Sequence, residues 1–284
     1  MNYNIEFEIS SKCNLKCPLC VRTHTLTHPE FLNNNLPFHI FAEILTNKPT
    51  TKIKFSGVSG DPFANNELEK YIDFAISKNI FVNITTNGTL GNIGLWKKLA
   101  LLGEKNKIKI TLSIDGLKDT NHLYRINAKW NRITKRLETI KNINHGFEWK
   151  FITFDHNKHQ INEVKNFAKM YGCSFFVLPL LKKNSMPDIL KLSVNKGEGT
   201  NYILKTAIPN VTEFDCIHEK ENRLFVDVKG NIWPCFFHYD HYLRFGYDFE
   251  TPNFNKLLDH NNQDRCKHSC GKRPDNMRYG CKFI

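Results

Sequence analysis

Apolar and polar positions alternate with two different periods between residues 3 and 180. Short segments rich in Val, Ile, Phe and Thr have the period of two that is typical of β-strands. Longer segments repeat apolar residues every three or four positions, as amphipathic helices do. The expected strands cover residues 3–10, 51–57, 80–88, 107–116, 147–154 and 174–180. The expected helices cover residues 36–47, 66–79, 93–103, 130–143 and 161–172.

This order of strands and helices predicts six βα repeats, and therefore an α/β protein with a parallel sheet and right-handed crossovers. Several strands are apolar at most positions, which is the pattern of strands that are buried on both faces. Six repeats are too few to close an eight-stranded barrel. We therefore expect an open, partial (β/α)6 barrel whose active site lies at the carboxyl ends of the strands.

The pattern changes after Leu181. Residues 182–210 have no clear periodicity, and we expect them to link a barrel at 1–181 to a small unit at 211–284. Within that unit, residues 222–235 (NRLFVDVKGNIWPC) alternate around a Lys-Gly pair, which predicts a β-hairpin. The remainder is polar and contains cysteines, so a metal would have to supply the stability that a small core cannot.

The composition indicates in which cellular compartment the protein is located. The chain has 284 residues, of which 40% are hydrophobic, and no apolar run approaches the roughly 20 residues of a membrane-spanning helix. The start, MNYNIEFEIS, lacks the basic and apolar segments of a signal peptide. We expect a cytoplasmic protein without membrane contact. In that compartment clustered cysteines bind metals or act in catalysis more often than they form disulfides.

The formal net charge of +12 is compatible with a nucleic-acid partner. However, Lys and Arg are spread along the chain. Their runs are short, as in LLKKN, and they form no stripe interleaved with aromatic residues. Nucleic-acid binding is therefore an alternative and not the main expectation.

Three of the nine cysteines, Cys13, Cys17 and Cys20, lie in the segment ISSKCNLKCPLCVR directly after the first expected strand. A structural zinc site uses four ligands, usually from paired C-x2-C units. Three thiolates on a [4Fe–4S] cluster leave one iron open to a substrate or cofactor. The C-x3-C-x2-C spacing therefore favours an iron–sulfur cluster over zinc.

CNLKCPLC resembles the signature of radical S-adenosylmethionine (radical SAM) enzymes, in which the amino and carboxylate groups of the cofactor's methionine occupy the open iron. Residues 55–63, FSGVSGDPF, resemble the family's glycine-rich segment after the second strand, which usually ends Gly-Gly-Glu-Pro. The resemblance implies that the backbone of Ser59, Gly60, Asp61 and Pro62 supports the methionine amino group. Asp61 stands where the family has Glu, and Leu19 where it often has an aromatic residue.

The segments ITTNGTL at 84–90 and LSIDGLKDTNHLYR at 112–125 match the family's third and fourth strands in type and order. The resemblance covers about residues 3–181. It implies that Ser113 and Asp115 bind the ribose of the cofactor, that Arg125 binds its carboxylate, and that Asn87 belongs to the same site. Considered alone, an Asp-Gly after a strand is more often a simple turn.

Near the other end, Cys216 is followed by 13 residues, Gly230, four more residues and Cys235. This spacing resembles the opening of the SPASM and twitch extensions of radical SAM maturases, and the cysteine count suits the shorter twitch form. The resemblance implies an auxiliary [4Fe–4S] cluster bound by four of five cysteines. We expect Cys216, Cys235, Cys266 and Cys270 to be the ligands, with Cys281 as the spare; a structural zinc site is the alternative.

The resemblance implies an enzyme that reductively cleaves SAM to a 5′-deoxyadenosyl radical. That radical would abstract hydrogen from a peptide or from a small metabolite such as an aminosugar, in an oxidation or a rearrangement. Flavodoxin or ferredoxin would supply the electron. Radical modification of RNA is one alternative. Another is epimerisation with Cys173 or Cys281 as hydrogen donor, although a lone cysteine such as Cys173 is more often a buried core residue. A non-catalytic iron–sulfur or zinc protein would leave the order of the cofactor segments unexplained.

Overall fold

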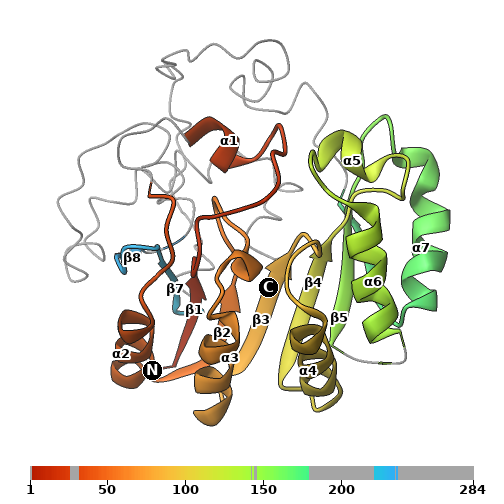
Figure 1. Cartoon of the computed structure of the whole chain (residues 1–284). Helices are drawn as coiled ribbons and strands as arrows, with labels where there is room; N and C mark the ends of the chain where they lie inside the picture. The colour runs from red at the N-terminus through yellow and green to blue at the C-terminus, as the bar shows by residue number, and fades with distance from the viewer. Residues whose placement is uncertain are drawn as a thin grey trace, which may run out of the picture.

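The computed structural model describes residues 2–25, 32–141, 143, 146–178, 221–233 and 235 (Figure 1). Its strands are β1 (Tyr3–Phe7), β2 (Thr50–Phe55), β3 (Phe81–Thr86), β4 (Ile108–Ser113), β5 (Phe147–Ile152), β6 (Ser174–Leu178), β7 (Arg223–Val226) and β8 (Ile232–Trp233). Its helices are α1 (Val21–Thr25), α2 (Phe38–Asn47), α3 (Leu68–Ser77), α4 (Ile93–Glu104), α5 (Asn121–Tyr124), α6 (Trp130–Ile140) and α7 (Ile161–Met170). Two 3-10 turns, Pro62–Ala64 and Lys158–Gln160, complete the set.

The strands form a single sheet in the order β6-β5-β4-β3-β2-β1-β7-β8. From β1 to β6 each strand pairs in parallel with the next one along the chain. Helices α2, α3, α4, α6 and α7 connect these strands, one in each crossover. The predicted α/β architecture with six parallel strands is therefore confirmed. Within the described residues no helix is long and apolar enough to cross a membrane.

The parallel strands bury one face and leave the other partly accessible. In β5, Phe147, Trp149 and Phe151 are buried, whereas Glu148 and Lys150 between them are half-buried. The expectation that such strands are buried on both faces is wrong, because the connecting helices lie along one face only (Figure 1). We call the opposite side the polar face. Its side chains include Asn4, Glu6, Lys52, Lys54, Asn83, Thr85, Lys109, Thr111, Glu148 and Lys150.

The hairpin predicted at 222–235 is present as β7 and β8, which pair antiparallel around Gly230. Its first strand also pairs in parallel with β1, so Asn4 faces Arg223 and Phe7 faces Val226. The sheet of the first 181 residues thus continues into the hairpin instead of ending at β1. The linker predicted at 182–210 lies outside the described residues, and the proposed domain boundaries stay predictions.

An aromatic cluster joins α2 and α3 to the buried face of β1 and β2. The ring centroid of Phe41 lies 4.9 Å from that of Phe7, 5.7 Å from that of Phe55 and 4.9 Å from that of Tyr71. Phe41 is fully buried. Aromatic rings contribute large buried areas and favour such edge-to-face and tilted contacts, so this cluster stabilises the strand that leads into the cysteine loop.

We predict that Phe41→Ala lowers the free energy of unfolding by about 3–5 kcal/mol, because it leaves a cavity among five aromatic neighbours. Urea denaturation followed by circular dichroism measures the change. Leu101→Ala is the control, since Leu101 is 57% exposed on α4 and should change stability by less than about 0.5 kcal/mol. Equal midpoints for the two variants would contradict the placement of Phe41 in the core.

Candidate functional site

Four loops meet at the carboxyl edge of the sheet, in the upper part of Figure 1. They follow β1, β2, β3 and β4. The backbone N–H of Asp61 donates to the carbonyl of Lys12 at 2.8 Å, and the side-chain amide of Asn87 lies 3.7 Å from Cys13 Sγ. The sequence analysis assigned these segments to one site although they are spread over more than a hundred residues. The structure places them next to one another.

The cysteine loop is a compact turn between β1 and α1. The N–H of Cys20 donates to the carbonyl of Cys17 at 3.1 Å, and the N–H of Leu15 donates to Cys13 Sγ at 3.4 Å. Cys17 is buried, and Cys13 and Cys20 are half-buried. The charges of Cys20 and Cys17 raise the pKa of Cys13, and the charge of Cys20 raises the pKa of Cys17, as expected for sulfur atoms that lie close together.

Burial raises the pKa of all three thiols, and it raises that of Cys13 to about 12. Such thiols stay protonated unless a cation compensates the thiolate charge, and a coordinated metal does so directly. Within the described ranges no three His, Cys, Asp or Glu side chains converge on the position of a single metal ion. An iron–sulfur cluster binds each thiolate to a different iron atom, so its ligands need not converge on one point. The donor set fits such a cluster.

Arg125 and Asp115 form an almost completely buried ion pair beside this loop. Arg125 Nε lies 2.7 Å from Asp115 Oδ2, and the other carboxylate oxygen accepts the N–H of Ile152 at 2.7 Å. The charge of Arg125 and a hydrogen bond from its side chain favour the thiolate of Cys17, which partly offsets the effect of burial on that pKa. Asp115 therefore holds Arg125 in place and is itself hydrogen-bonded on both oxygens.

Asp61 has a structural role that explains its place in the glycine-rich loop. Its buried carboxylate accepts hydrogen bonds from the N–H of Phe63 at 3.0 Å, the N–H of Asn87 at 2.8 Å and the hydroxyl of Thr86 at 2.9 Å. Burial raises the pKa of Asp61, while the hydrogen bonds to Asn87 and Phe63 oppose that change. The side chain thus ties the loop after β2 to the end of β3. Pro62 begins the short turn that Asp61 caps.

Glu8 is a site residue that the sequence analysis missed. It is fully buried at the end of β1, and its Oε1 accepts the N–H of Ser59 at 2.7 Å and the hydroxyl of Ser59 at 2.9 Å. The available signal was the alternation in IEFEIS, which places two glutamates on the same face of one strand. Glu8 joins the polar face to the glycine-rich loop.

Lys150 is a second residue that the sequence analysis missed. It lies on β5 opposite Ser113 of β4. Burial, followed by the positive charge of Arg125, lowers the pKa of Lys150 to about 8. In the described part of the chain no hydrogen bond or ion pair of its amine is found. This cation is therefore available to a ligand near the site.

Gly60 lies where two loops approach each other too closely for a side chain. A Cβ atom at Gly60 would stand 1.9 Å from the carbonyl oxygen of Ser10 and 2.7 Å from the Cα of Ser11. Both obstacles are backbone atoms, which cannot rotate away. Gly60 therefore allows the loop after β2 to pack against the start of the cysteine loop.

We predict that Gly60→Ala separates these loops and lowers the iron bound after anaerobic reconstitution by at least about half, because a contact below 3 Å with backbone has to be relieved by moving one loop. Iron and sulfide assays measure the loss. The control is Gly94→Ala in the exposed first turn of α4, where a Cβ atom meets only the side chain of Asn92 at 3.2 Å. Full iron content in the Gly60 variant would contradict the assigned contact.

The remaining predicted cysteines do not join this site. Cys173 is buried in the hydrophobic core, at the amino end of β6 and so at the opposite edge of the sheet from the cysteine loop. That is the position of a core residue, and it gives no support to hydrogen donation. Cys235 is buried just after β8. The other C-terminal cysteines, Cys216, Cys266, Cys270 and Cys281, lie outside the described residues.

The chain was compared with protein families and with curated proteins. The profile of the family described as the radical SAM superfamily matches residues 7–170. A tungsten-containing aldehyde ferredoxin oxidoreductase cofactor-modifying protein from Pyrococcus furiosus is 29% identical over 99 residues, which cover 34% of this chain and 27% of that protein. The match thus spans only about a quarter of this curated relative, 27% of its length.

Solved structures share the fold. SuiB from Streptococcus suis, bound to S-adenosylmethionine, has a TM-score of 0.62 and 18% identity over 92% of this chain and 66% of its own. SuiB bound to the precursor peptide SuiA has a TM-score of 0.62, 16% identity and coverage of 92% and 65%. The protein anSMEcpe with bound AdoMet has a TM-score of 0.52 and 21% identity over 64% of this chain and 50% of its own.

Proposed function

Because the chain belongs to the radical SAM superfamily, we propose that Cys13, Cys17 and Cys20 hold a [4Fe–4S] cluster and that S-adenosylmethionine binds at the iron left open. One observation carries this proposal. The cysteine loop, the loop around Gly60 and the pair Arg125–Asp115 meet at one edge of a parallel sheet. Three thiols supply ligands for three irons, and the cofactor of this family binds the fourth.

Different residues around the cysteine loop are proposed to bind different parts of the cofactor. The backbone near Gly60 lies close enough to the cysteine loop to contact a ligand bound there. Ser113 is proposed to bind the ribose, because Asp115 is already engaged by Arg125 and Ile152. Arg125 pairs with Asp115 through Nε, so other guanidinium nitrogens can bind a carboxylate. When bound, the reduced cluster supplies an electron that cleaves S-adenosylmethionine to methionine and a hydrogen-abstracting 5′-deoxyadenosyl radical.

We predict that Cys17→Ala abolishes cleavage of S-adenosylmethionine, with a loss of more than about a hundredfold, which exceeds the effect of altering a residue behind a metal ligand. The assay is 5′-deoxyadenosine formed by the anaerobically reconstituted, dithionite-reduced protein. Cys173→Ala is the matched control, since it removes a buried thiol in the core and should leave most of the cleavage intact. Retained cleavage in the Cys17 variant would reject the ligand assignment, and an equal loss in both variants would indicate misfolding.

We propose that an auxiliary [4Fe–4S] cluster lies in a C-terminal, twitch-like extension of a partial (β/α)6 barrel, with four ligands from Cys216, Cys235, Cys266, Cys270 and Cys281. Support comes from Cys235, which is 7% exposed and lies two residues after the end of β8. Strand β8 pairs with β7, and β7 pairs with β1, so this thiol is anchored to the strand that also leads to Cys13.

We predict about eight irons and eight sulfides in each reconstituted chain, as two cubic clusters require. Cys235→Ser should reduce the count to about four while cleavage of S-adenosylmethionine persists. Cys20→Ser should also leave about four irons but should abolish cleavage. A wild-type count of four would remove the auxiliary cluster and leave the SAM-binding cluster in place.

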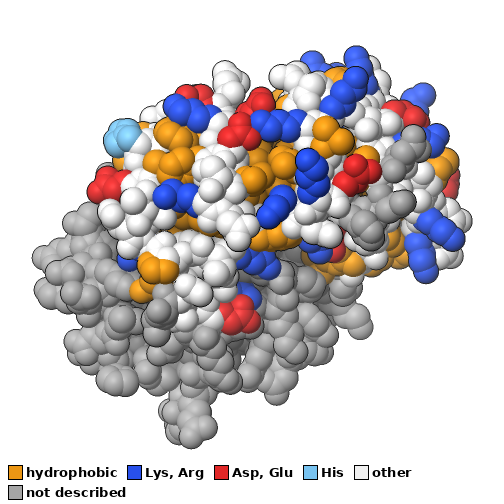
Figure 2. Space-filling model, turned by 90° about the horizontal axis from the view of Figure 1, so that it is seen from below, with side chains coloured by type: hydrophobic (Ala, Val, Ile, Leu, Met, Phe, Trp, Pro, Cys, Tyr) orange, Lys and Arg blue, Asp and Glu red, His pale blue; other side chains and the backbone are white. Residues whose placement is uncertain are grey.

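For the substrate we propose a peptide or a small metabolite, for example an aminosugar, that is oxidised or rearranged, with electrons from flavodoxin or ferredoxin. The similarity to SuiB bound to the precursor peptide SuiA favours a peptide. RNA modification is less favoured, because Lys and Arg are spread along the sequence in short runs. On the side opposite the cysteine loop they lie among acidic, neutral and hydrophobic side chains (Figure 2). Epimerisation would have to use Cys281, since Cys173 is buried in the core.

A further inference from the structure

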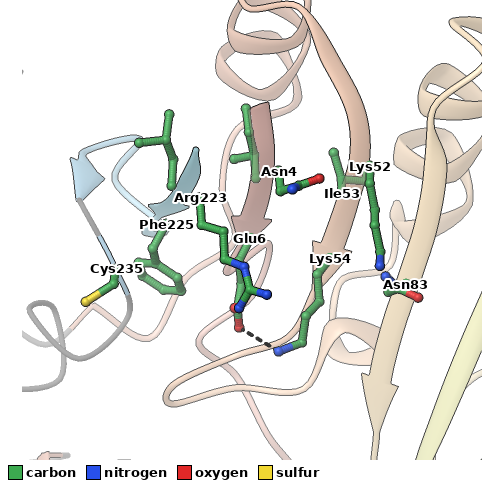
Figure 3. Close-up of a pocket in the computed structure, with 11 residues that line it drawn as sticks. Asn4, Glu6, Lys52, Ile53, Lys54, Asn83, Arg223, Phe225 and Cys235 are labelled. Atoms are coloured by element: carbon green, nitrogen blue, oxygen red, sulfur yellow. Dashed lines mark hydrogen bonds and ion pairs between the residues drawn. The ribbon is translucent and has the colours of Figure 1, made fainter. Parts of the chain in front are cut away.

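The polar face contains a depression, which Figure 3 shows in close-up. It holds about 330 Å³ of empty space, including its open mouth. Strands β1, β2, β3 and β7 form its walls, and Cys235 lies at one side. Its polar lining residues are Asn4, Glu6, Lys52, Lys54, Asn83 and Arg223.

Three cations extend into this region from two strands. Lys52 and Arg223 both face Asn4 of β1, so they share a row on the polar face, and Lys54 lies one row nearer the cysteine loop. Figure 3 shows the three side chains on the same side of the sheet. Their positive charges are mutually unfavourable. Burial lowers the pKa of Lys52, and the charges of Arg223, Lys109 and Lys54 lower it further, while the charge of Glu221 opposes this change.

The acidic groups nearby are already engaged. Glu6 accepts Lys54 at 3.2 Å and also accepts the hydroxyl of Ser56. Arg223 Nε lies 2.8 Å from a carboxylate oxygen of Glu221. Within the described ranges Lys52 makes no hydrogen bond or ion pair, and its amine points toward Asn83 (Figure 3). An ammonium group that is half-buried among other cations is poorly compensated. An anion that binds beside it therefore lowers the free energy of the protein.

We propose that Lys52, assisted by Arg223 and Asn83, binds an anionic group of the substrate, a carboxylate or a phosphate. This inference rests on the proposed function, since it assumes that the substrate lies along the polar face. The asparagine amide and the guanidinium add hydrogen-bond donors to the charge of Lys52, which suits an oxyanion with several acceptor oxygens.

The position of Lys52 also predicts the distance between the anionic group of the substrate and its reacting carbon. Its row begins at Asn4, four residues before Glu8 at the carboxyl end of β1. At about 3.3 Å for each residue, the anion would bind about 13 Å below the edge where the cysteine loop lies. The anionic group is therefore separated from the reacting carbon by the length of a few peptide residues or of a sugar and its linker.

The test uses the full chain with its clusters reconstituted. Binding of inorganic phosphate and of succinate is measured by isothermal titration at constant ionic strength. We expect saturable binding of at least one anion by the wild type. In Lys52→Gln the dissociation constant should rise by at least about tenfold, the effect of losing one hydrogen bond to a charged group. Lys52→Arg, which keeps the charge, should restore most of the affinity.

Lys97→Gln is the matched control, because it removes the same charge from an exposed position on α4. Binding of phosphate alone would identify a phosphate site, and binding of succinate alone a carboxylate site. Absence of saturable binding for both anions, or equal affinities in the Lys52→Gln and Lys97→Gln proteins, would overturn the proposal. Cleavage of S-adenosylmethionine without substrate should persist in Lys97→Gln. If the wild type fails to cleave but still binds the anion, the proposed function fails and the anion site stands.

Discussion

The candidate site depends on one buried carboxylate. Asp61 accepts hydrogen bonds from Phe63, Thr86 and Asn87, and its own N–H donates to the carbonyl of Lys12. Removing a carboxylate from water costs several kcal/mol unless hydrogen bonds replace the lost hydration. Here the replacement comes from groups on two loops, so the loops must stay together for the charge to be satisfied. The cysteine loop is held to the same arrangement through Lys12.

This network also explains why aspartate serves where the family has glutamate. The shorter side chain turns back onto the N–H of Phe63, two residues ahead, and so caps the short turn that begins at Pro62. Such local capping is typical of Asp, whose oxygen reaches the backbone two residues on. The substitution therefore keeps the function of the loop, which is close backbone approach at Gly60, while the side chain stabilises its shape.

A second buried interaction, between Arg125 and Asp115, places a positive charge next to Cys17. A buried ion pair gains little stability by itself, because desolvation offsets much of the attraction. Its value here is positional. Asp115 is fixed by the N–H of Ile152, and Arg125 is fixed by Asp115. The guanidinium therefore stands beside a thiol that would have to lose its proton to bind the proposed cluster.

The sequence predicted the six strands, the main helices and the meeting of four segments at one edge, because period and motif order are local properties. It did not predict which strand face would be polar. That depends on where the crossover helices pack, and the alternating charges in TKIKF and FEWKF were the signal. The resemblance assigned Asp115 to the ribose of the cofactor, and that role stays a prediction. The sequence did not show that Asp115 pairs with Arg125, because the two residues are ten positions apart and meet only after the loop folds. The pairing of β7 with β1 joins residues more than two hundred positions apart, and no local pattern encodes such a contact.

The charged side chains of the polar face are mostly paired with one another. Most of its charges are neutralised across neighbouring strands, as in Glu6 with Lys54 and Glu148 with Lys109. Opposite charges that face each other on neighbouring strands stabilise a sheet, and they reduce the cost of a half-buried polar face. Lys150 near the cysteine loop and Lys52 at the far end have no such partner among the described residues. Since the cross-strand pairs neutralise their own charges, Lys52 and Lys150 are the positions on the described polar face where an anionic ligand would gain most from a charge.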